Sequence, residues 1–229
     1  MAQIVKSIGL NPVLDLHIES ISSDIAREID VCFDVTDESS DHRVRFLIEC
    51  KYTQSPWIVL HGFEKPFGAF ELDGFCRTKN AKSFWTTGEE FTRNEKHLID
   101  NDYFGSTILT GNSIHEPTKK KPDRRDIPYK TLKKITLSAQ DMIAKFDEID
   151  TGLQATCIPC VVIDNDLFQA RWNDKINDFT IHPITMARLS WMGTGKRRSV
   201  LISTLDNAES FCRTLMNMGN CINAINHGI

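Results

Sequence analysis

Four charged residues occupy alternate positions in two nearby apolar segments. Glu28 and Asp30 lie in the first segment, and Glu49 and Lys51 lie in the second. Alternate residues of a strand point to the same side of a sheet, so two neighbouring strands would bring these side chains onto one surface. Facing carboxylates repel each other, whereas a hard divalent cation prefers such oxygen ligands. The spacing therefore predicts a site for Mg²⁺ or Mn²⁺, with Lys51 placed to orient a water or stabilise charge on a phosphate.

The segments that carry these residues show the period-two alternation of strands. Residues 14–19, 27–35 and 43–52 each alternate apolar and polar side chains, and polar turns separate them. They predict an antiparallel meander with one apolar face and one charged face. The apolar face is expected to lie under one of two later helices. Its members are Ile29, Val31, Phe33, Val35, Phe46, Ile48, Cys50 and Tyr52.

The rest of the chain mixes helices with strands. Apolar residues recur at helical spacing over 129–146 and 211–225, and Asp206 is expected to cap the second of these helices. Further strands are predicted around 161–163, over 180–192 and over 199–204. The pattern predicts an α/β (α+β) fold, a mixed central β-sheet flanked by helices. Residues 1–229 are expected to form a single domain, with 62–128 as an insertion or subdomain within it.

Two runs of residues carry a resemblance to a known family: Arg27-Glu28-Ile29-Asp30-Val31 and Phe46-Leu47-Ile48-Glu49-Cys50-Lys51-Tyr52. Together they resemble the PD-(D/E)xK nuclease superfamily, which has the restriction-endonuclease-like fold. The resemblance covers residues 27–60. It implies that Asp30 and Glu49 bind Mg²⁺ or Mn²⁺, that the backbone carbonyl of Cys50 is a further ligand, and that Lys51 serves the attacking water.

The chain also departs from the family pattern. Ile29 stands before Asp30 where the family has proline. The family usually opens with a helix that carries an acidic residue, and few residues precede the first predicted strand here. Glu19 or Glu28 is an alternative source of that acid, and the sequence does not distinguish them.

The resemblance implies a magnesium-dependent endonuclease that hydrolyses phosphodiester bonds in nucleic acid. DNA is the expected substrate, and restriction, repair or defence the expected role. A homodimer or a partner protein subunit is expected as well. The alternative is a catalytically inactive subunit that keeps the nuclease fold for binding or assembly, with its charged face held by ion pairs. Metal binding at Asp30 and Glu49 distinguishes the two hypotheses.

Basic residues gather in two places. Segment 119–134 holds eight Lys or Arg against two Asp, although the whole chain carries a net charge of −4. A second group follows the glycines near residue 195. Both are expected to contact nucleic-acid phosphates, and the alternative for the first is a solvated loop. The residues concerned are Lys119, Lys120, Lys121, Arg124, Arg125, Lys196, Arg197 and Arg198.

Composition agrees with a globular protein of the cytoplasm. The 229 residues are 41% hydrophobic and 25% charged, and no apolar run approaches the roughly 18 residues that a membrane helix needs. The N-terminal residues lack the pattern of a secretory signal. Seven cysteines is an odd number, typical of a reducing compartment. The pair Cys157 and Cys160 is interpreted as buried structural thiols because a second pair at zinc-ligand spacing is missing.

Overall fold

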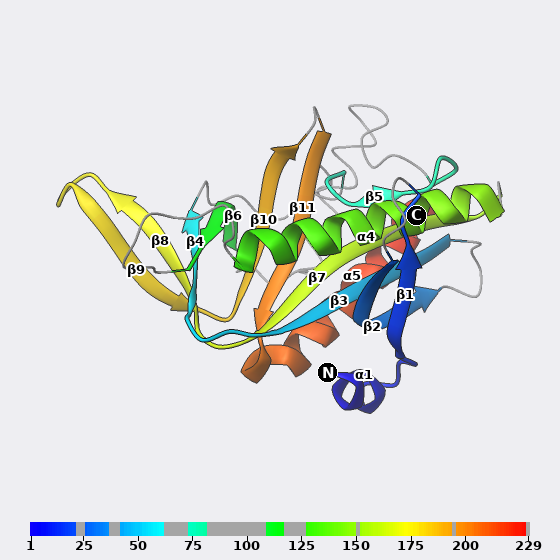
Figure 1. Ribbon diagram of the computed structural model, residues 1–229, viewed down its shortest axis with the longest axis horizontal. Helices are drawn as coiled ribbons and strands as arrows, with labels where there is room; N and C mark the ends of the chain where they lie inside the picture. The colour runs from blue at the N-terminus through cyan, green and yellow to red at the C-terminus, as the bar shows by residue number, and fades with distance from the viewer. Residues whose placement is uncertain are drawn as a thin grey trace.

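The structure of the protein is a computed structural model, and it describes residues 1–21, 26–36, 42–61, 73–81, 109–116, 127–149, 152–193 and 196–227. Within these ranges, eleven strands form one mixed sheet with a helix on each face (Figure 1). The helices are α1 (Ala2–Ser7), α4 (Ile127–Ile149) and α5 (Ala208–His227). The strands are β1 (Val13–Glu19), β2 (Ala26–Thr36), β3 (His42–Tyr52), β4 (Trp57–His61), β5 (Cys76–Arg77), β6 (Leu109–His115), β7 (Gln154–Asp164), β8 (Leu167–Asn173), β9 (Asp178–Ile184), β10 (Met186–Gly193) and β11 (Lys196–Thr204).

The sheet combines an antiparallel meander with a parallel centre. Its order is β1-β2-β3-β7-β11-β10-β6-β4-β8-β9, and the short β5 pairs separately with β7. Strands β1, β2 and β3 are antiparallel to one another, whereas β7 runs parallel to both β3 and β11. Strand β7 is buried along almost its whole length, as expected for a strand covered on both faces. The predicted mixed sheet flanked by helices is confirmed.

Helix α5 covers one face of the sheet. Its stripe of Phe211, Leu215, Met218 and Ile222 packs against the alternate residues of β2, β3 and β7 that point toward it. The contact is close at Gly219, where an added Cβ would lie 2.7 Å from Cβ of Val35. The predicted burial of the apolar face of the meander under a C-terminal helix is confirmed for Val31, Phe33, Val35, Phe46 and Ile48. Tyr52, expected on the same face, is 77% exposed.

Helix α4 covers the opposite face. Leu132, Ile135, Ala139 and Ile143 pack there against Leu47 and other alternate residues of the central strands. The prediction that this face of the meander is a charged surface was therefore wrong. Its apolar members Cys32 and Leu47 are buried in a second core, and the charged Glu49 is fully buried as well.

Strand β2 also departs from strict alternation. Ile29 belongs to the core under α4, whereas Val31 belongs to the core under α5, so the prediction that they share a face was wrong. The change occurs around Asp30. Asp15, which occupies the facing position of β1 between the pairs Leu14–Val31 and Leu16–Ile29, has a left-handed backbone with φ of 50°. This local irregularity explains why period two fails there.

Two boundaries near the C-terminal end differ from expectation. The predicted strand over 180–192 is two strands, β9 and β10, which separate at Thr185 because they pair with different neighbours. Asp206 does not cap α5. It lies inside a 3₁₀ turn, Leu205–Asn207, that leads directly into the helix at Ala208.

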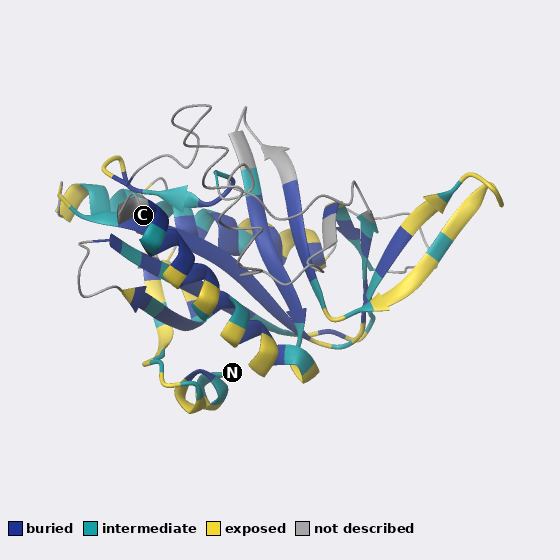
Figure 2. Cartoon of the chain, turned by 180° about the vertical axis from the view of Figure 1, so that it is seen from behind, coloured by how far each residue is buried: buried dark blue, intermediate teal, exposed yellow. Residues whose placement is uncertain are grey.

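The described parts of 62–128 add to the same sheet. Strand β6 lies between β10 and β4, and β4 in turn pairs with β8. The β8–β9 hairpin projects from this end of the molecule; β9 is largely exposed, whereas the first half of β8 is mostly buried, as Figure 2 shows. Most of the remaining positions of 62–128 lie outside the described residues. No helix in the described ranges is both long and apolar enough to cross a membrane.

Candidate active site

The meander register brings Asp30 beside the segment that carries Glu49 and Lys51. Strands β2 and β3 are paired up to Val31 opposite Ile48, so Asp30 follows directly after the last pair of β2 and Glu49 directly after that of β3. There the Oδ2 atom of Asp30 accepts a hydrogen bond of 2.6 Å from the backbone N–H of Cys50. Asp30 is therefore fixed against the backbone between Glu49 and Lys51.

Glu49 is the most deeply placed residue of the site. Its side chain is 0% exposed. It lies on the α4 side of the sheet, the side to which the buried Leu47 also points, two residues earlier in β3. Lys51 Nζ lies 2.5 Å from Glu49 Oε1. Lys134 Nζ of α4 donates to both carboxylate oxygens, at 2.7 and 2.8 Å. One buried carboxylate thus holds two ammonium groups from two different elements.

The charges of the site balance. Asp30 and Glu49 supply two carboxylates, and Lys51 and Lys134 supply two ammonium groups. The repulsion predicted between facing carboxylates is consequently offset by protein cations. The two lysine side chains are each 32% exposed, so solvent reaches the cationic side of the site.

Lys134 was not singled out from the sequence, where it ended the basic segment 119–134. The feature of the sequence that could have identified Lys134 is its position on the predicted helix. It directly precedes the buried Ile135 and lies one turn before Ser138, whose hydroxyl donates to the Lys134 carbonyl at 2.9 Å. A lysine beside the buried stripe of a helix is expected to reach over the edge of the sheet beneath it.

The two alternative acids lie elsewhere in the meander. Glu19 ends β1, is 82% exposed and pairs with Lys145 of α4 at 2.9 Å. That interaction lowers the pKa of Glu19 below its ordinary value. Glu28 is exposed and faces His17 across the β1–β2 pair. Asp30 is the acid whose carboxylate is bonded to the backbone beside Glu49. The structure shows no such contact for Glu19 or Glu28.

Cys50 contributes its backbone rather than its thiol. Burial, followed by the nearby carboxylate of Asp30, raises the pKa of the Cys50 thiol to about 11. At neutral pH this thiol stays protonated and is a poor nucleophile or metal ligand. The remaining donors for a divalent ion are the carboxylates of Asp30 and Glu49 and the carbonyl of Cys50. Mg²⁺ is commonly held by one or two carboxylates with water completing its shell, so this donor set fits the ion.

The predicted nucleic-acid contacts are mostly beyond what the structure describes. Lys119, Lys120, Lys121, Arg124 and Arg125 lie outside the described residues, and the backbone of Lys196 and Arg197 begins β11. Arg198 can be placed. With the amide of Gln140 turned so that its oxygen faces the guanidinium, Arg198 Nε lies 3.0 Å from that oxygen. Arg198 is thereby attached to α4, the helix that carries Lys134.

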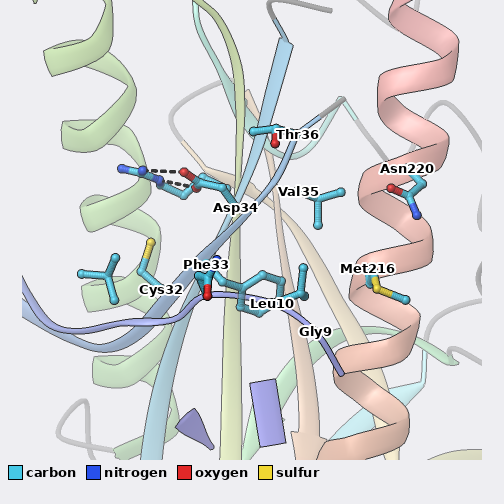
Figure 3. Close-up of a pocket in the computed structure, with 12 residues that line it drawn as sticks. Gly9, Leu10, Cys32, Phe33, Asp34, Val35, Thr36, Met216 and Asn220 are labelled. Carbon is cyan, nitrogen blue, oxygen red and sulfur yellow. Dashed lines mark hydrogen bonds and ion pairs between the residues drawn. The ribbon is translucent and has the colours of Figure 1, made fainter. Parts of the chain in front are cut away.

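A separate pocket lies farther along β2. It has a volume of about 500 Å³ and lies between the segment that follows α1 and helix α5 (Figure 3). Asp34 and Arg45 form a two-bonded ion pair at its wall, with distances of 2.6 and 2.7 Å. Asp30, Glu49 and Lys51 do not line it. This pocket and the acid–lysine cluster are therefore different places.

Among the described residues, no group of three or more His, Cys, Asp and Glu side chains is arranged to hold a metal ion. Any ion at the candidate site would thus rest on two carboxylates, backbone and water. Comparisons with protein-family models, curated proteins and solved structures found no match.

Proposed function

We propose that this protein is a metal-dependent nuclease that hydrolyses phosphodiester bonds in nucleic acid, with DNA as the expected substrate. The observation that carries the proposal is the junction of β2 and β3. Asp30 is bonded to the backbone of Cys50, directly between Glu49 and Lys51, and Lys51 touches Glu49. The resemblance of residues 27–60 to the PD-(D/E)xK superfamily, with its restriction-endonuclease-like fold, supports the same proposal.

Each residue has a distinct task in this proposal. Asp30 and Glu49 would hold Mg²⁺ or Mn²⁺, with the Cys50 carbonyl as a further ligand. When bound, such an ion supplies activation of water for in-line attack and neutralises charge on the phosphate. Lys51 supplies an ammonium group that orients the attacking water or stabilises the charge that develops on the phosphate. The burial of Glu49 fixes the direction of its carboxylate before substrate arrives.

A second candidate function rests on the same ion pairs. Because two lysines already neutralise Glu49, the cluster is also the arrangement expected of an inert subunit that keeps the fold for binding or assembly. A homodimer or partner protein suits either function. The two functions differ in their response to metal, because only the nuclease gains stability from Mg²⁺ or Mn²⁺.

The test compares the native chain with Lys51→Ala on plasmid and single-stranded DNA, in Mg²⁺, Mn²⁺ or chelator. We expect cleavage only with metal, and a loss of about 10²–10³-fold in Lys51→Ala with folding and metal binding retained. Lys145→Ala is a matched control, because Lys145 is 30% exposed and also pairs with a glutamate. A native chain that is inert on both substrates and gains no thermal stability from metal would support the inert subunit. Cleavage that survives chelator would place the chemistry elsewhere.

A further inference from the structure

Lys134 has a position that the proposed metal ligands and Lys51 leave unexplained. It reaches Glu49 from α4, a different element, and contacts both oxygens of a carboxylate that Lys51 already contacts. Two ammonium groups thus face one buried carboxylate, which is one positive charge more than Glu49 itself balances.

The same carboxylate has a second proposed partner. If Glu49 coordinates a divalent cation, its oxygens cannot also keep both ammonium groups at hydrogen-bond distance, because like charges would crowd around one carboxylate. One lysine must therefore withdraw. Lys51 is on the same strand, two residues from Glu49, so its backbone stays beside the ion. Lys134 lies on the neighbouring helix, so its long side chain can turn away from Glu49 without moving the strand. It is 32% exposed, as is Lys51, so it can turn toward solvent.

We propose that Lys134 is a metal-released phosphate ligand. This inference rests on the proposed function. Without metal, Lys134 is bound to Glu49. With metal, it turns outward and binds a non-bridging oxygen of the nucleic-acid backbone next to the scissile bond. A divalent ion raises the summed charge of Asp30, Glu49, Lys51 and Lys134 from zero to +2, which attracts a phosphodiester to the place where Lys134 is freed.

Lys134 therefore contacts nucleic acid only when metal is bound. Each phosphate contact contributes about 0.9 to the slope of log affinity against log salt for duplex DNA, and about 0.7 for a single strand. Removal of Lys134 should therefore reduce this slope by about one contact in Mg²⁺ and leave it unchanged in chelator. A purely structural lysine would not produce a metal-dependent difference.

The experiment measures binding of one oligonucleotide, in duplex and single-stranded form, over a series of NaCl concentrations. Phosphorothioate linkages in the oligonucleotide keep cleavage slow. Both proteins keep Lys51, because its ammonium group is part of the crowding at Glu49, and one carries Lys134→Met. Each is measured at one fixed Mg²⁺ concentration and again in chelator. A control protein carries Lys145→Met in place of Lys134→Met. Lys145 lies on the same helix but pairs with Glu19 rather than with Glu49. If Lys134→Met does not fold, Lys134→Gln replaces it.

We expect the slope to fall by about 0.7–0.9 for Lys134→Met in Mg²⁺ alone. Mg²⁺ titration without DNA, followed by thermal unfolding, should also show tighter binding in Lys134→Met, since a competing cation has gone. An equal slope change in chelator, or none in either condition, would overturn the inference while native cleavage still supports the nuclease. A native chain that neither binds Mg²⁺ nor cleaves would remove the proposed function, and the inference with it.

Discussion

Replacement of Glu49 by glutamine tests the centre of the site without changing its shape. The native carboxylate is 0% exposed, forms an ion pair with Lys51 at 2.5 Å and accepts hydrogen bonds from Lys134 at 2.7 and 2.8 Å. Glutamine keeps one oxygen that can accept, but its amide group is a donor and faces an ammonium group. Two ammonium groups then remain close together without the carboxylate that bound them both.

The size of the effect follows from the burial of the partners. Loss of one partner from a fully buried ion pair costs about 3–5 kcal/mol, whereas an exposed pair contributes about 0–1 kcal/mol. Glu49 is fully buried, but each lysine is 32% exposed, so solvent screens part of the charge. We expect Glu49→Gln to lower the free energy of unfolding by about 2–3 kcal/mol. For a chain of this length, the melting temperature should fall by about 5–10 °C.

Urea unfolding of the native chain and the variant, without metal, measures this difference. Glu209→Gln is the control, because Glu209 is 61% exposed and pairs with Arg213 one helical turn away. Its effect should stay within about 0.5 kcal/mol. Lys134→Met in the Glu49→Gln background should recover about 1 kcal/mol, because it removes a cation that has lost its partner. Equal stability of Glu49→Gln and the native chain would refute the buried two-lysine pairing.

Three further changes have defined outcomes. Asp30→Ala should abolish cleavage and metal-induced stabilisation. In the metal-free protein it should lower the free energy of unfolding by about 1–3 kcal/mol, because the backbone N–H of Cys50 loses its acceptor. An unchanged denaturant midpoint would contradict this. Gly219→Ala should destabilise by about 1–3 kcal/mol because the added methyl meets Val35, which thermal unfolding can check. Burial raises the pKa of Cys32 from 9.0 to about 12. The unfolded thiol ionises first, so its contribution to stability is complete below pH 9 and falls between pH 9 and 12 by up to about 1.4 kcal/mol per pH unit. Urea titrations at pH 8 and 10.5 should show a smaller loss in Cys32→Ala.

Local patterns in the sequence were sufficient for the elements that hold the site. Alternation over residues 27–35 and 43–52 predicted β2 and β3, and helical spacing predicted α4 and α5. These signals are local because each reflects which side of one element is buried. Asp30 and Glu49 could be placed near each other because their strands follow each other closely in the sequence, so the pairing of the meander follows from nearby residues.

Contacts between distant segments could not be predicted in the same way. Lys134 meets Glu49 across 85 residues of sequence, and only the packing of α4 on the sheet brings them together. Strand β6 enters the sheet between β10 and β4 although no local feature specifies those neighbours. The different surroundings of Ile29 and Val31 depend on an irregularity shared with Asp15 of another strand.

The parallel pairing of β3 with β7 has a consequence for synthesis of the chain. His42 of β3 and Thr156 of β7 are 114 residues apart, although their side chains share a hydrogen bond. At about 5–20 residues per second, the ribosome needs roughly 6–23 s to make the intervening chain. During that time β3 can pair with β2 but not yet with β7, so its other edge is open. Helix α4 is made only near the end of this interval, and α5, which covers Phe46 and Ile48, is made after it. The strand that carries Glu49 and Lys51 is thus synthesised early, but its pairing with β7 forms late. In the interval, the open edge of β3 must be kept from pairing with other chains.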